Sequence, residues 1–193
     1  MADPASPTTT TPGAGLRAAG WLAFALLVIV VFGAAFIRFA QGDVMLEGAV
    51  DVARWSYRVA AIVFVLVIAG VAVLGWDVLR PASRLVLGTQ VALAIALTFL
   101  GRLTPSSDHP LVAFGNPLGG LALVGLGWWL VLAASPAIGR ASPLLGGALV
   151  ATGFAAIAAL VVWMPGLVAG LAVQFAATAV LVAGVTLAYR RGD

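Results

Sequence analysis

The feature that most constrains this chain is a series of apolar runs, each about 20 residues long, separated by short polar breaks. An α-helix of about 20 apolar residues crosses the hydrocarbon core of a bilayer, which is about 30 Å thick. The runs are apolar on every face, whereas a membrane-spanning β-strand alternates apolar and polar side chains. The sequence therefore predicts an all-α integral membrane protein.

Composition agrees with this prediction and excludes several classes of function. Of the 193 residues, 63% are hydrophobic and 9% are charged, a proportion that a soluble domain cannot bury in one core. There is no cysteine, which excludes disulfides, thiolate metal sites, iron–sulfur clusters and covalently attached c-type heme. The basic residues are all arginine and form no basic stripe, so nucleic-acid binding is not expected.

The apolar runs predict a six-transmembrane helix bundle. The predicted spans are Leu16–Ala40, Arg54–Trp76, Leu85–Gly101, Leu111–Ala134, Leu144–Trp163 and a last one ending near Tyr189. Pro165 and Gly166 could kink one long helix, but membrane-length segments flank them, which favours a hairpin. We expect a disordered cytoplasmic tail over residues 1–15, an antiparallel four-helix bundle over 16–134, and a C-terminal two-helix hairpin over 135–193.

The positions of the arginines predict the orientation of the chain. Six arginines fall on the side of both termini and four on the other side, where acidic residues dilute them. Because positive loops stay in the cytoplasm, both termini should be cytoplasmic. We expect a multi-pass protein of a bacterial-type inner membrane, in contact with lipid and with other membrane protein subunits.

Two arginines lie at the beginning of the second predicted span. Arg54 and Arg58 share one helical face and repel each other unless an anionic group lies between them. Asp51, three residues before Arg54, is a natural local partner. The pair could extend to lipid phosphate and neighbouring acids, or it could form an anion cradle for a cofactor carboxylate or for the acidic patch of a partner protein.

The remaining polar residues predict no catalytic or metal site. His109 is the single histidine, in a loop beside Asp108, and one histidine cannot form a bis-histidine heme site. Hydrogen bonds between helices are expected for four interior polar residues, namely Gln90, Thr98, Asn116 and Gln174. The stretches "GNPLG" and "GLVAG" are small-xxx-small patterns that allow close helix contact.

Four segments carry a resemblance to a known family. They are "FGAAFIRFAQGD" at the end of the first span, "RWSYRVAA" opening the second, "LTFLGRLTP" closing the third and "PLVAFGNPLGGLALVGLGWWL" forming the fourth. This layout resembles one four-helix half of the heme A synthase family. In that family the second helix opens with Glu-x-x-His-Arg, the fourth helix carries a second His, and the two imidazoles ligate heme.

The resemblance implies a degenerate heme site. It puts Arg54 at the position of the glutamate, Tyr57 at that of the first histidine and Asn116 near the second, while Arg58 matches. In a heme-binding relative, the arginine after the ligand could pair with a heme propionate. Tyrosine can ligate heme iron but Asn116 is not a competent opposite ligand, so no cofactor is predicted unless ligation is atypical or a partner supplies it.

These features together predict a non-catalytic, heme A synthase-like protein. It would be an accessory or assembly factor for a heme-containing respiratory oxidase. A structural subunit of a larger membrane bioenergetic complex is the first alternative, and a small transporter is the second. Co-purification separates a factor from a subunit, and substrate-dependent flux in proteoliposomes would identify a transporter.

Overall fold

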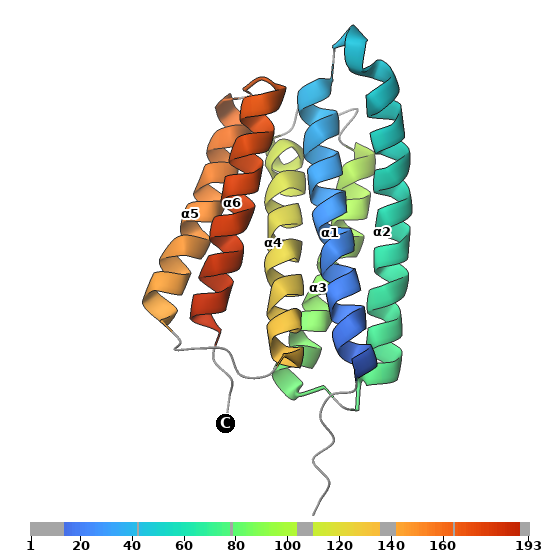
Figure 1. The fold of residues 1–193 in the computed structure, drawn as a ribbon, viewed down its shortest axis with the longest axis vertical. Helices are drawn as coiled ribbons and strands as arrows, with labels where there is room; N and C mark the ends of the chain where they lie inside the picture. The colour runs from blue at the N-terminus through green and yellow to red at the C-terminus, as the bar shows by residue number, and fades with distance from the viewer. Residues whose placement is uncertain are drawn as a thin grey trace, which may run out of the picture.

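The protein is a bundle of six long α-helices in a computed structural model, which describes residues 14–41, 43–77, 79–103, 110–135, 142–163 and 165–189. The helices follow one another up and down the bundle, so that neighbours in sequence are antiparallel (Figure 1). Their bounds are α1 Ala14–Ala40, α2 Glu47–Gly75, α3 Pro81–Leu103, α4 Pro110–Ala134, α5 Pro143–Trp163 and α6 Leu167–Ala188, with a short 3-10 helix, η1 Val44–Leu46, before α2.

All six helices are long and apolar enough to cross a bilayer. The prediction of an all-α, six-transmembrane helix bundle is therefore confirmed. α5 and α6 are separate helices on either side of Pro165 and Gly166, as the hairpin interpretation required. The expected tail overlaps the first helix slightly, because Ala14 and Gly15 already belong to α1; residues 1–13 lie outside the described part of the chain.

The second helix begins earlier than predicted. It starts at Glu47 and not at Arg54, so the connection after α1 is short. Asp43 opens this connection: its carboxylate accepts a hydrogen bond of 3.0 Å from the backbone N–H of Met45, and Glu47 lies in the first turn of α2. A negative charge there complements the positive end of the helix dipole, which explains why polar sequence is helical here.

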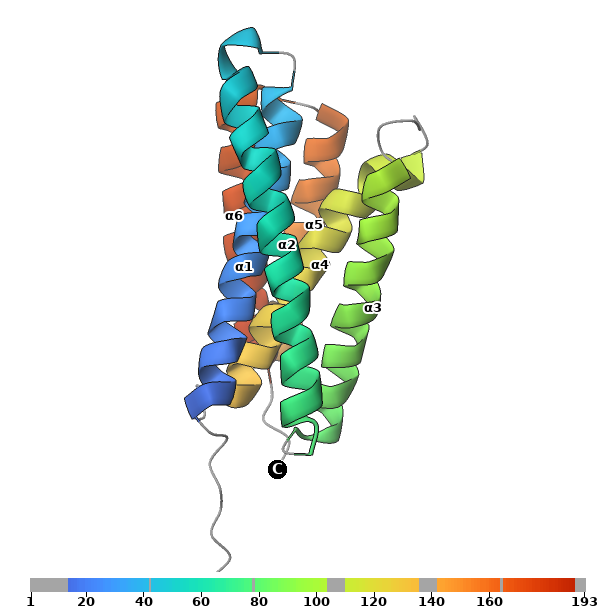
Figure 2. The same ribbon diagram turned by 90° about the vertical axis from the view of Figure 1, so that its right-hand side faces the viewer.

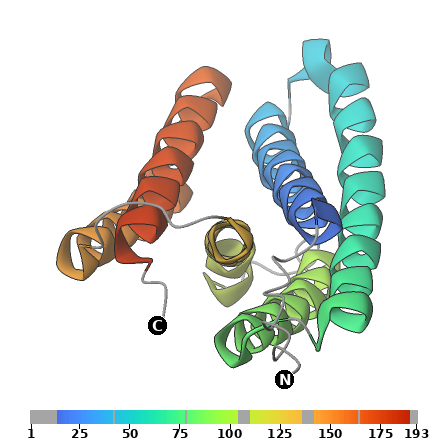
Figure 3. The same ribbon diagram turned by 60° about the horizontal axis from the view of Figure 1, so that its bottom comes forward.

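The first four helices form one group, and α5 and α6 lie beside it. α1 packs against both α2 and α4, and α3 packs mainly against α4. α6 packs against α1 and α4, and α5 also contacts α4 (Figures 2 and 3). α4 is therefore the central helix, since every other helix except α2 packs along it.

Among the described residues, the core of the bundle is apolar apart from two amides, Gln90 and Gln174, and two hydroxyls, Ser83 and Thr178. The largest fully buried side chains are Leu27, Leu87, Gln90, Leu121, Val124, Ile157 and Leu181. Large apolar side chains also cover the outer surface, as is expected where helices face lipid and not water.

Glycines set the distance between α5 and α6. A β-carbon added to Gly146 would lie 2.6 Å from the carbonyl oxygen of Gly184, and one added to Gly184 would lie 2.8 Å from that of Gly146. A β-carbon on Gly153 would lie 3.0 Å from the carbonyl oxygen of Ala177. The two backbones are thus in direct contact, which only glycine permits; such close packing is how helices associate in lipid.

The two predicted small-residue patterns differ in how closely their glycines pack against other helices. Gly115 and Gly119 of α4 face Leu100 and Leu97 of α3, at 3.2 and 2.5 Å from the positions of added β-carbons. In the second pattern only Gly170 is close-packed, against a phenylalanine ring of α1, whereas Gly166 has open space around it. The contact between α5 and α6 was not predicted from either pattern.

We expect Gly146→Ala to destabilise the protein and Gly147→Ala not to do so. A methyl group on Gly146 meets the backbone of α6, and overpacking of this kind costs about 1–3 kcal/mol. Gly147 is the matched control, because an added β-carbon there has nothing within 4 Å and alanine favours the helix by up to about 1 kcal/mol. Thermal unfolding in mild detergent measures both. Equal melting temperatures for the two variants would contradict the described packing.

Candidate functional site

The candidate site lies at the η1 end of the bundle, where α1 ends and α2 and α4 begin. Arg54 and Asp51 form an ion pair there, with Nη1 of the arginine 3.1 Å from Oδ1 of the aspartate. The predicted local partnership is therefore confirmed. Both side chains are well exposed, so the pair contributes about 0–1 kcal/mol to stability.

Tyr57 and Arg58 point to different surroundings although they are adjacent in sequence. Tyr57 is partly buried and faces α1, where its Cβ lies 3.6 Å from the position of a β-carbon on Gly33. Arg58 is exposed on the outer surface of α2 and has no ion pair with the described residues. Asp51 pairs with Arg54, so it is not the carboxylate that neutralises Arg58.

Arg58 lies at the depth where a cation becomes costly. Counting about 20 residues back from Val73, where the candidate span of α2 ends, places the hydrocarbon boundary near Arg54. Arg54 then lies at this boundary and Arg58 lies one helical turn inside it. An arginine at such a depth extends towards the interface or pairs with an anionic group.

A third arginine, Arg38, joins α1 to the beginning of α4. Its Nη1 donates a hydrogen bond to the carbonyl oxygen of Ala113, at 3.4 Å. In a regular α-helix this carbonyl would accept from the N–H of residue 117, but that residue is Pro117, which has no N–H. Arg38 thus supplies from another helix a donor that Pro117 removed from α4.

Asn116, the second suspected ligand position, lies beside this contact. It is partly buried in α4, between Ala113 and Pro117, and has an interaction of its own. Gly120, one turn further along α4, packs against Val31 of α1. The structure therefore places Asn116 near α1 and places Tyr57 against α1 from the side of α2.

We expected all four interior polar residues to form hydrogen bonds between helices, but not all of them do. Thr98 donates to the carbonyl oxygen of Ala94 in its own helix, at 2.8 Å, which is the usual arrangement of threonine in a helix. Neither amide atom of Gln90 has a hydrogen-bond partner among the described residues, and the same is true of Nε2 of Gln174. Gln90 instead packs its amide nitrogen against Gly127 of α4.

One interhelical hydrogen bond is not predictable from the sequence. The indole N–H of Trp128 in α4 donates to the hydroxyl of Thr186 in α6, at 2.8 Å. The same indole lies against Trp21 and Phe24 of α1, with ring centres 5.4 and 5.0 Å away. In the sequence, Trp128 lies near the end of an apolar run, where an indole typically anchors at the membrane interface, and nothing in the sequence indicates its partner.

His109 and Asp108 fall outside the described residues, so their predicted roles are not described by the structure. Within the described residues no group of three or more His, Cys, Asp or Glu side chains could hold a metal ion. Comparisons with protein-family models, with curated proteins and with solved structures find no match to this chain.

We expect Arg38 to matter less once Pro117 is replaced. Pro117→Ala restores an N–H for the carbonyl of Ala113, so Arg38→Met should cost about 1 kcal/mol of unfolding free energy in the native background and clearly less beside Pro117→Ala. Methionine keeps most of the apolar stem of arginine while removing its donors. A double-mutant cycle of unfolding in detergent measures the difference. An equal cost in both backgrounds would show that the carbonyl contact contributes nothing.

Proposed function

We propose that this protein is a non-catalytic accessory or assembly factor for a heme-containing respiratory oxidase, without tightly bound heme of its own. The oxidase is suggested by the resemblance of residues 16–134 to one half of the heme A synthase family. That the chain is a multi-pass membrane protein follows from its six apolar helices. One observation supports binding of this chain to another protein, namely the surroundings of Arg58.

Arg58 belongs to a face of α2 that suits a protein partner. The face also carries Trp55 and Ile62, which are 68% and 63% exposed. Tryptophan and arginine are the residue types that most often dominate binding energy at interfaces. A partner carboxylate beside Arg58 would neutralise a cation that has no acidic partner among the described residues of its own chain.

Co-purification tests this proposal with two variants. Tagged protein extracted from membranes in mild detergent should retain the oxidase, which its heme absorbance reports. Arg58→Ala should weaken retention, because loss of one partner from a close charge pair at an interface costs about 2–5 kcal/mol. Arg54→Ala is the matched control: Arg54 already pairs with Asp51, so retention should stay near the native level.

The outcomes separate the alternatives. If Arg58→Ala retains the oxidase as well as the native protein does, Arg58 serves only to reach lipid phosphate and the proposed interface is wrong. An assembly factor should be found with incomplete oxidase, whereas a structural subunit should stay stoichiometric with the mature complex. Because both arginines are exposed, neither variant should change the thermal stability of the isolated chain by more than about 1 kcal/mol.

We also propose that both chain termini face the cytoplasm of a bacterial-type inner membrane, as the distribution of arginines indicates. Met45 in η1 and Asp77 after α2 are exposed and lie at opposite ends of the bundle. The chain has no native cysteine, so single cysteines can be placed at either position.

We expect Met45→Cys to react with a membrane-impermeant thiol reagent in intact spheroplasts, and Asp77→Cys to react only after the membrane is opened. Mass spectrometry of the labelled protein measures both. The reverse pattern would invert the proposed orientation, and labelling of both from one side would contradict the span assignment.

A further inference from the structure

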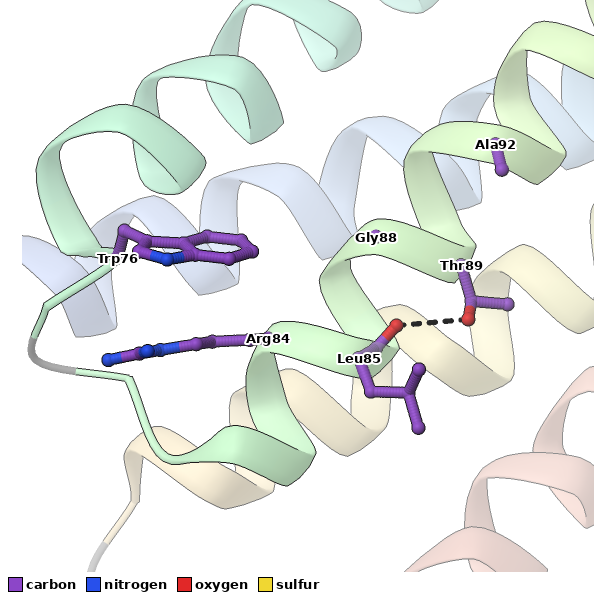
Figure 4. A pocket seen from close by; sticks show the side chains of 6 residues that line it. All are labelled: Trp76, Arg84, Leu85, Gly88, Thr89 and Ala92. Atoms are coloured by element: carbon purple, nitrogen blue, oxygen red, sulfur yellow. Dashed lines mark hydrogen bonds between the residues drawn. The ribbon is translucent and has the colours of Figure 1, made fainter.

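A groove lies at the other end of the bundle from η1, between the end of α2 and the beginning of α3. Its volume is about 560 Å³, and it is lined by Trp76, Arg84, Leu85, Gly88, Thr89 and Ala92 (Figure 4). One end of the groove is polar and aromatic, and the remainder is a row of small or apolar residues along α3. This difference between its two ends suggests an amphipathic occupant.

The polar end is a cation held in a fixed orientation. The guanidinium of Arg84 stacks on the indole of Trp76, with Cζ 5.4 Å from the ring centre. Its Nε donates a hydrogen bond of 3.0 Å to the carbonyl oxygen of Leu79. The two Nη atoms make no hydrogen bond to the described residues, so four N–H donors stay available in a preset plane.

The apolar part of the groove is an exposed face of α3, which we call the track. Its residues are Leu85, Gly88, Thr89 and Ala92. Gly88 and Thr89 each lie three or four residues from Leu85 and from Ala92, so the four residues share one face over about 10 Å. The hydroxyl of Thr89 donates to the carbonyl oxygen of Leu85, at 2.9 Å, so it is satisfied within the helix. A β-carbon on Gly88 would have nothing within 4 Å, which shows that the floor of the track is open.

The groove lies at the depth in the bilayer where a lipid has its headgroup and the first part of its acyl chain. The two candidate spans here end at Val73 and begin at Pro81, so Trp76 and Arg84 are close to the membrane–water interface. The track from Leu85 to Ala92 continues from there into the hydrocarbon region. Leu85 is 73% exposed, so the track opens onto the bilayer and not into the bundle.

We propose that this groove binds an anionic phospholipid, with its phosphate at Arg84 and one acyl chain along the track. A guanidinium with free Nη donors matches a phosphate diester in geometry and charge. Arg80 adds a second positive charge to the same turn and Asp77 one negative charge, so the segment is net positive. The positive end of the α3 dipole favours the same anion.

Lipid retention by the full chain tests the proposal. Protein purified in mild detergent is mixed with phosphatidylglycerol or phosphatidylcholine, and native mass spectrometry counts the bound lipids. The native protein should retain phosphatidylglycerol in preference to phosphatidylcholine. Arg84→Gln and Gly88→Leu should each lower the affinity for phosphatidylglycerol roughly tenfold, the first by removing the charge and the second by filling the track.

Two controls and three outcomes make the test decisive. Arg54→Gln and Gly147→Leu change an exposed charge and an open glycine elsewhere, and should bind phosphatidylglycerol as the native protein does. Gly88→Leu leaves Arg84 and its contacts in place, so it tests the groove even if Arg84→Gln unfolds the turn that contains residue 84. Equal binding of the two lipids, native binding by both groove variants, or displacement of phosphatidylglycerol by millimolar inorganic phosphate would each overturn the proposal.

Discussion

In the interior of a bilayer no water is available to hydrogen-bond the backbone, so each N–H and C=O group must find a partner in the protein. This constraint accounts for the six long helices and also for the way in which an interruption in α4 is satisfied. Pro117 leaves the carbonyl of Ala113 without its helical donor, and Arg38 of α1 donates to it. A charged side chain at the margin of the membrane thereby supplies a missing backbone hydrogen bond of another helix.

Association of the helices depends on small residues, because burial of apolar surface gains little in apolar lipid. Gly146 and Gly184 bring the backbones of α5 and α6 into contact. Gly127 of α4 admits both Leu27 of α1 and the amide of Gln90. The hydrogen bond from Trp128 to Thr186 adds a polar contact between α4 and α6 to this close packing.

Four arginines of the same chemical type end up in four different environments. Arg38 bonds a carbonyl, Arg54 pairs with a carboxylate, and Arg84 stacks on an indole. Arg58 has no ion pair with the described residues and faces outward. The first two bond to groups of their own chain. Arg58 and the Nη atoms of Arg84, at opposite ends of the bundle, make no hydrogen bond to the described residues, and they are the groups that we propose to meet a partner protein and a lipid.

The sequence by itself determined the number of helices, their approximate limits and the ion pair of Arg54 with Asp51, because these depend on hydropathy and on spacing within one helix. It placed the start of α2 too late, since the helix continues beyond the apolar run into polar residues that cap it favourably. The groove at Arg84, the support of Ala113 by Arg38 and the lack of a described partner for Gln90 were decided by tertiary structure alone. Each depends on which faces of two helices meet, and nearly uniform apolar sequence contains little information about that choice.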